Sequence, residues 1–339
     1  MGSVLAAGPR PAAAVNVPSP DIVPPPPAPE QPSTSSPATS EPASAPLAGD
    51  NGPGTFEDLH KKCKDLFPQI FEGGKLIISK GLSSHFQISH TLSLSTFQPS
   101  AYRFGCTYVG TKQLGPAEAF PLIIGDIDAS GNLNANIIHA LSDRLRAKAV
   151  AQIQNNKCVA SQLTTDYKGS DFTSSLTLGN IDPINESGIC VGQYLQRVSS
   201  RLDLGAELLY QYGQQVPGKE ISILSLAARL TGDQWALSAN VSPLAGNLHA
   251  CYYQKINETL QIGAELETSL RMQESVATVG YQIEIPNANV LFRGQFDTNW
   301  CIGAVMEKKL LPFPFTFALS GYANHVKAQF RFGIGLIVG

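Results

Sequence analysis

Histidine and cysteine side chains are the groups in this chain best suited to hold a metal ion or to act as nucleophiles. The histidines form no HExxH motif and no paired ligand spacing, and the cysteines form no CxxC pair. There is also no P-loop and no nucleophile elbow. We therefore expect neither an enzyme nor a bound cofactor or metal, and scattered thiols are typical of a protein made in the reducing cytosol. The chain has six residues of each type: His60, His85, His90, His139, His249 and His325, and Cys63, Cys106, Cys158, Cys190, Cys251 and Cys301.

Charged and polar residues recur instead at every second position along most of the chain. In residues 202–210, Asp203, Gly205 and Glu207 alternate with leucine, alanine and tyrosine. In residues 328–338, Arg331 and two glycines alternate with phenylalanine, isoleucine, leucine and valine. Successive side chains of a strand point to opposite faces, so each segment has one apolar face and one polar face. This pattern favours membrane strands with lipid on one side and an aqueous lumen on the other.

The number of strands follows from their spacing. Membrane strands of roughly 9–11 residues with short turns repeat every ~14 residues, so residues 71–339 have room for about 19 strands. No apolar run reaches the ~18–20 residues of a membrane-spanning helix. The predicted fold is an all-β transmembrane β-barrel formed by residues 71–339.

A soluble all-β protein, such as a propeller, also contains alternating strands. Two observations favour the membrane. Charged residues make up only 15% of the chain, against about 25% for an ordinary soluble protein. Almost no strand has the continuous apolar run of a strand that is buried on both faces.

The N-terminal residues 1–54 have a different composition from the rest of the chain. They hold 14 of the 24 prolines and no aromatic residue, which predicts a disordered, proline-rich extension. This extension has one basic and four acidic residues, for a net charge of −3 that equals the charge of the whole chain. Residues 55–339 therefore carry no net charge. They lack the excess of basic residues that is typical of a protein that binds nucleic acid.

One helix is predicted at residues 55–67, and residues 55–70 form this helix and its linker to the barrel. Thr55 can cap the N-terminus with Asp58 as its capping-box partner, and Pro68 ends the helix. Its apolar residues recur at helical spacing and form one stripe, which makes the helix amphipathic. They are Phe56, Leu59, Cys63, Leu66 and Phe67.

The alternation also predicts which charged residues face the lumen. Glu265 with Glu267, and Asp203 with Glu207, form the clearest acidic patches, and such patches can hold a cationic polypeptide weakly at several sites. A solvated charge with no role is the alternative for each single residue. The predicted lumen acids are Asp166, Asp203, Glu207, Glu265, Glu267, Glu284, Asp297 and Glu307, and the bases are Arg103, Arg146, Lys148, Arg229, Lys255, Arg293 and Arg331.

Five segments together resemble the pore-forming subunit of the translocase of the outer mitochondrial membrane. They are PGTFEDLHKKCKDLFP (53–68), YVGTKQ (108–113), KGSDFT (168–173), RMQ (271–273) and NHVKAQFRFGIGLIVG (324–339). The resemblance implies a 19-stranded porin-type barrel with the 55–67 helix inside its lumen. It implies a C-terminal β-signal for membrane assembly on Arg331, Gly333, Leu336 and Val338.

The resemblance also implies a function and partners. The barrel would conduct unfolded mitochondrial precursor proteins with cationic presequences across the outer membrane. Its partners would be single-span receptor subunits, small accessory subunits and membrane lipid, in an oligomeric complex. Two alternatives remain open: a metabolite channel of the voltage-dependent anion channel type, and a soluble protein whose proline-rich tail binds SH3- or WW-type domains.

Overall fold

The structure is a computed structural model that describes residues 52–339, except 97–98, 116–117, 183–185, 215 and 217. The chain divides into a unit of residues 1–46 and a unit of residues 47–339. The first unit lies outside the described residues, and with it falls most of the proline-rich extension predicted for residues 1–54. Residues 52–54 are described and belong to the second unit.

Nineteen strands form a single sheet in the described part of the chain, which confirms the predicted all-β barrel of about 19 strands. In chain order the strands are β1 (Gly73–Gly81), β2 (Phe86–Leu94), β3 (Ala101–Gly115), β4 (Glu118–Asp128), β5 (Leu133–Ala140), β6 (Leu145–Gln154), β7 (Lys157–Lys168), β8 (Phe172–Asp182), β9 (Ser187–Arg197), β10 (Leu202–Tyr212), β11 (Glu220–Thr231), β12 (Trp235–Ser242), β13 (Asn247–Lys255), β14 (Leu260–Ser269), β15 (Glu274–Ile285), β16 (Val290–Asp297), β17 (Cys301–Lys309), β18 (Phe315–Asn324) and β19 (Gln329–Val338). Strands such as β10 and β19 keep the alternation of apolar and polar residues from which they were predicted.

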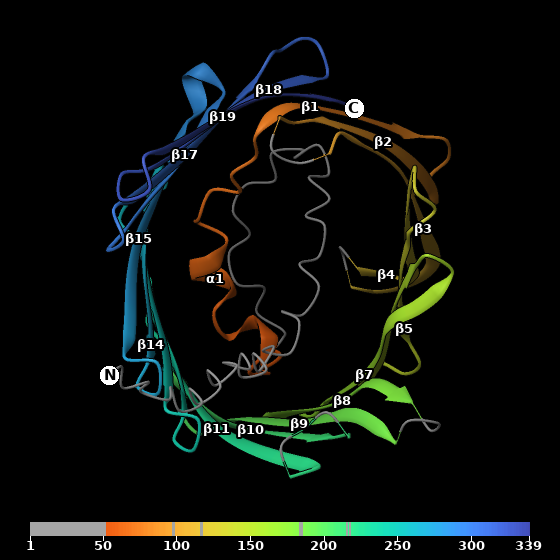
Figure 1. Cartoon of the computed structure of the whole chain (residues 1–339), viewed down its shortest axis with the longest axis vertical. Coiled ribbons are helices and arrows are strands. Elements are labelled where there is room, and N and C mark those ends of the chain that lie inside the picture. Colours follow the sequence, from red (N-terminus) through yellow and green to blue (C-terminus); the bar gives the residue numbers. More distant parts are fainter. Residues whose placement is uncertain (1–51, 97–98, 116–117, 183–185, 215, 217) are drawn as a thin grey trace, which may run out of the picture. The chain divides into compact units, whose positions relative to one another are not determined.

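The sheet closes on itself through its first and last strands (Figure 1). Every consecutive pair of strands is antiparallel, whereas β1 and β19 pair in parallel, with Gly73 opposite Gly333 and Ile78 opposite Val338. An up-and-down barrel with an odd number of strands must contain one parallel pair, because its first and last strands run in the same direction. Among the described strands, each pairs with two neighbours, so the sheet has no open edge, as a membrane requires.

Short turns connect neighbouring strands and fix their register. Between β6 and β7, Asn155 and Asn156 have φ of 50° and 60°. Two consecutive positive φ values are the mark of the tight hairpin turn that matches the twist of the strands, and asparagine tolerates them better than most residues. A single 3₁₀ turn, η2 (Pro286–Ala288), connects β15 to β16.

The segment before β1 forms short helical turns rather than the continuous helix predicted for residues 55–67. It contains the 3₁₀ turn η1 (Glu57–Leu59) and the helix α1 (Lys61–Lys64). The Thr55 hydroxyl donates a hydrogen bond of 2.6 Å to the Asp58 carboxylate. It does not cap a helix as predicted, because η1 and α1 begin after Phe56 and His60 and neither has a side-chain cap. Helices of this length are marginal on their own, so packing on the barrel wall determines the final conformation. None of the described helices has the length and apolar character that a membrane-spanning helix needs.

Candidate functional site

The two faces of the barrel wall carry different side chains. On β19, Phe332 and Ile334 are 74% and 58% exposed on the outside. Gly333 and Gly335, which alternate with them, face the interior, where the Phe71 ring lies against both. Large apolar side chains of the other strands are exposed in the same way, among them Leu163, Leu176, Leu204, Leu208, Leu224, Leu226, Val279 and Ile302. The wall therefore has the apolar exterior and polar interior of a lipid-embedded barrel.

Residues 52–71, here called the lumenal segment, pack against the inside of the wall (Figure 1). Phe56 and Leu59 are buried with Leu195 of β9 and Ala227 of β11. The Cys63 thiol donates to the backbone carbonyls of β13 and β14, at 3.6 Å each. Leu66 is also buried, whereas Phe67 is half-buried. The predicted apolar stripe is thus the surface with which the segment contacts the wall.

Glycines of the wall allow the lumenal segment to approach the strands closely. A Cβ atom at Gly263 would lie 2.8 Å from Cδ1 of Leu66 and 3.0 Å from Sγ of Cys63. At Gly280 it would lie 2.6 Å from the Phe67 ring. Any larger residue at these positions displaces the segment, so the glycines and the apolar stripe are complementary.

A second contact holds the start of the lumenal segment. Asp203 lies between Arg197 of β9 and Arg229 of β11, and the carboxylate accepts hydrogen bonds from both guanidinium groups, at 3.1 Å from Arg197 Nε and 2.6 Å from Arg229 Nη2. The same arginines donate to the backbone carbonyls of Gly52 and Pro53. Asp203 is only 3% exposed. Its charge is therefore neutralised within the wall, and in this conformation it is not accessible to a passing chain.

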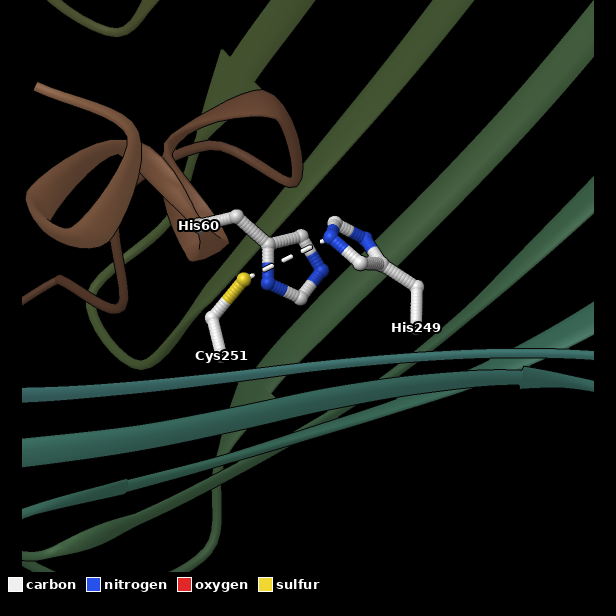
Figure 2. Close-up of side chains that lie close together, drawn as sticks. All are labelled: His60, His249 and Cys251. Atoms are coloured by element: carbon white, nitrogen blue, oxygen red, sulfur yellow. Dashed lines mark hydrogen bonds between the residues drawn. The ribbon is translucent and has the colours of Figure 1, made fainter. Parts of the chain in front are cut away.

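A third contact joins imidazole, thiol and carboxylate groups. His60 of the lumenal segment shares a hydrogen bond of 2.9 Å between Nδ1 and Oγ of Ser238 on β12. On β13, His249 Nε2 lies 2.6 Å from Oε1 of Glu265. The same nitrogen lies 3.4 Å from Sγ of Cys251 (Figure 2). Burial, and secondarily the nearby charge of His249, lower the pKa of His60 from 6.5 to about 4. His60 is therefore a neutral imidazole at physiological pH.

The remaining predicted acids are distributed around the lumen face. Glu207 and Glu267 line one polar hollow of about 510 Å³ together with Glu274. The other four are spread along four strands, and the structure does not bring them together. They are Asp166 on β7, Glu284 on β15, Asp297 on β16 and Glu307 on β17.

Further predicted lumen bases contact the lumenal segment or Glu72, the residue that follows it. Lys148 lies 3.8 Å from Glu57, and Arg331 lies 3.7 Å from Glu72. Gly333, a second β-signal residue, packs beneath Phe71, whereas Leu336 faces outward and is 38% exposed. Val338 ends β19 and pairs with Ile78 of β1. The other predicted bases also lie on the barrel strands: Arg103, Arg146, Lys255 and Arg293.

Some residues that complete these contacts were not predicted from the sequence. Arg197 was absent from the predicted bases, although Arg197 and Arg229 both lie directly opposite Asp203 in the strand register. Alignment of the hairpins β9–β10 and β10–β11 by their turns would have placed both arginines opposite Asp203. No sequence signal connects His60 with His249, because they lie on different elements far apart in the chain.

The closed wall, its apolar exterior and its polar lumen define a transmembrane β-barrel of the porin type. The family described as eukaryotic porin matches residues 52–333. The mitochondrial import receptor subunit TOM40 homolog of Xenopus laevis is 48% identical over 341 residues, which cover all of both chains. TOM40 homolog 2 of Drosophila melanogaster is 51% identical over 287 residues, which cover 85% of this chain and 84% of its own. The human TOM40 homolog is 50% identical over 287 residues, covering 85% of this chain and 78% of its own.

The chain therefore belongs to the eukaryotic porin family and, within it, to the TOM40 homologs. The resemblance identified from the sequence motifs is confirmed, and the chain is a β-barrel of the mitochondrial outer membrane. A solved mutant porin of Rh. blastica overlaps with 73% of this chain and 97% of its own at a TM-score of 0.44 and 15% identity.

Proposed function

We propose that the chain forms the protein-conducting channel through which unfolded precursor proteins cross the mitochondrial outer membrane. The observation that carries the proposal is a closed wall with a polar lumen in a chain about 50% identical to mitochondrial import receptor subunits. An unfolded chain exposes its backbone groups and needs a passage in which polar groups and water replace the membrane interior.

The charges of the lumen support passage of a cationic presequence. Glu207, Glu267 and Glu274 line one hollow, and the Glu267 side chain is 64% exposed. Exposed acids in a wet channel attract a cationic segment without holding it tightly, and weak binding at several sites is what transport requires. Passage of a polypeptide needs no bond to be made or broken, so the proposed function requires no catalytic residue.

The outer surface supports the proposed partners. Its apolar side chains would contact lipid, and parts of the same surface would bind single-span receptor subunits and small accessory subunits in an oligomeric complex. The β-signal residues Arg331, Gly333, Leu336 and Val338 would be recognised by the outer-membrane assembly machinery before β19 closes the barrel.

Photo-crosslinking to an arrested precursor tests the proposed function. A photoreactive amino acid replaces Glu267, which faces the lumen, or its neighbour Leu266, which is on the opposite face and 37% exposed. The precursor carries a tightly folded C-terminal domain that stalls it in the channel of isolated mitochondria. We expect crosslinks from position 267 and none from position 266. Equal crosslinking from both positions, or none from any lumen position, would contradict the proposal.

A further inference from the structure

Two imidazoles and a thiol converge where the lumenal segment meets β13. One ligand atom each of His60, His249 and Cys251 lies within 4.8 Å of the others. Figure 2 shows the three side chains pointing toward one another, His60 from the helical turns and the other two from the strand. The rings of His60 and His249 have centroids 4.2 Å apart. Two separate elements thus bring nitrogen and sulfur donors together at one point.

The spacing of these atoms suits a tetrahedral metal ion. Zinc bonds of about 2.3 Å to sulfur and about 2.0–2.1 Å to nitrogen place neighbouring ligand atoms about 3.3–3.6 Å apart. The observed distance from Cys251 Sγ to His249 Nε2 is 3.4 Å. A carboxylate oxygen of Glu265 lies 3.8 Å from the same sulfur and 2.6 Å from the same nitrogen. It is therefore near enough to supply a fourth ligand.

The environment of His60 points to a ligand in the cluster. Nδ1 bonds to Ser238, and Nε2 is buried without a hydrogen-bond partner among the described residues. Buried polar atoms without partners are uncommon, and each requires an explanation. Histidines that bind metals ordinarily donate their other ring nitrogen to a nearby oxygen, which fixes the tautomer and the ring orientation. Ser238 can fulfil that role for His60.

We propose that His60, His249 and Cys251, with Glu265 as the fourth ligand, bind one divalent transition-metal ion, for which Zn²⁺ has the best-matched donor chemistry. Mixed nitrogen, sulfur and carboxylate donors suit zinc rather than magnesium or calcium, which take oxygen ligands. Cys251 binds as the thiolate and its proton passes to solvent. The ion joins the lumenal segment to the wall, because one ligand comes from the segment and three come from β13 and β14.

Cobalt substitution tests this site in the full chain, folded in detergent under reducing conditions. Tetrahedral Co²⁺ bound to a thiolate has intense visible absorption and a thiolate-to-cobalt charge-transfer band. We expect one Co²⁺ per chain with both features, and its displacement by Zn²⁺. If the chain takes up no Co²⁺, or if the charge-transfer band is absent, the proposal is wrong.

Matched variants identify the ligands. Cys251→Ser should abolish the charge-transfer band, whereas Cys158→Ser, which changes an exposed cysteine of β7, should leave it intact. His60→Gln changes the lumenal segment and leaves all barrel strands unaltered, so the barrel should still fold. This variant should weaken Co²⁺ binding by a factor of about ten or more. Ser238→Ala should have a similar effect, because the His60 ring loses the hydrogen bond that orients it. His85→Gln, in the turn before β2, is the matched histidine control. An unchanged band and affinity in Cys251→Ser and His60→Gln would overturn the assignment.

Discussion

Asp203 and Arg229 lie directly opposite each other on β10 and β11, and the guanidinium donates two hydrogen bonds, of 2.6 and 3.0 Å, to the same carboxylate oxygen. The Asp203 side chain is 5% exposed and that of Arg229 is 16% exposed. Because both side chains are largely buried, water screens the attraction between the two charges only weakly. Each charge therefore stabilises the other in the folded protein. Because Arg229 also donates to the Pro53 carbonyl, the pair holds the start of the lumenal segment against the wall.

Removal of the carboxylate charge should release the lumenal segment. In Asp203→Asn, two arginines are left without their counter-charge, and breaking a buried pair on one side costs on the order of 3–5 kcal/mol. The Cys63 thiol, 2% exposed in the folded protein, should then react with maleimide faster. Labelling of each cysteine is followed by mass spectrometry of peptides, with the exposed Cys158 as internal reference.

Glu267→Gln is the matched control, since its side chain is 64% exposed and lies on β14, whereas the arginines that bind the carbonyls of Gly52 and Pro53 lie on β9 and β11. Its Cys63 labelling rate should equal that of the unmodified chain. Equal rates in Asp203→Asn and Glu267→Gln would show that the ion pair does not hold the segment.

A larger residue at Gly263 should displace the same segment by steric exclusion. In Gly263→Leu, the new side chain occupies the space of Leu66 and Cys63, which lie 2.8 and 3.0 Å from the added Cβ. We expect faster Cys63 labelling with unchanged β-sheet content by circular dichroism. Gly192→Leu on β9, where an added Cβ meets nothing within 4 Å, is the control. Protection of Cys63 in Gly263→Leu would argue against close packing at this position.

The β-signal residues should be required for membrane assembly. Gly333 has no room for a side chain beneath Phe71, and Leu336 belongs to the outward apolar face of β19. The double variant Gly333→Gln, Leu336→Gln should be synthesised normally but should remain extractable from mitochondria by alkaline carbonate. Phe332→Leu, which keeps an apolar residue on the outward face, should insert normally. Carbonate-resistant insertion of the double variant would refute the assignment of the signal.

The barrel could be predicted from the sequence because its strands depend on a local pattern. Alternation along β10 or β19 determines which residues face the lumen, whatever the partner strands are. The helical segment could not be predicted in the same way. Its turns depend on contacts with strands far along the chain, such as the Cys63 bonds to the carbonyls of Tyr252 and Ala264. Residues of the apolar stripe lie against the wall, whereas the helical turns are shorter than the helix predicted for residues 55–67.

The acidic patches also depend on contacts between strands, which the sequence of one strand does not determine. The predicted patch of Asp203 with Glu207 does not act as one unit, because Asp203 is neutralised by Arg197 and Arg229. Similarly, Glu265 bonds to His249, whereas Glu267 remains exposed. Charge pairs between strands arise from register, which the alternation of a single strand does not contain.

Neutralising the exposed acids should change the ion preference of the channel. Glu267→Gln with Glu274→Gln removes two negative charges from the polar hollow, so the preference for cations and the residence time of a presequence peptide should both fall. Reversal potentials in a salt gradient and peptide-blocking events measure the two effects. The control is Glu258→Gln with Lys219→Gln, which alters turn residues outside the strands. If the acid variant and the control behave alike, the hollow does not contribute to selectivity.

Single-channel recording of the purified full chain in a planar bilayer, with a cationic amphipathic presequence peptide added, tests the proposed function most directly. A protein-conducting channel should give a wide, cation-preferring pore that the peptide blocks transiently and in a voltage-dependent manner. An anion-preferring pore that is indifferent to the peptide would contradict the proposal and would favour a metabolite channel.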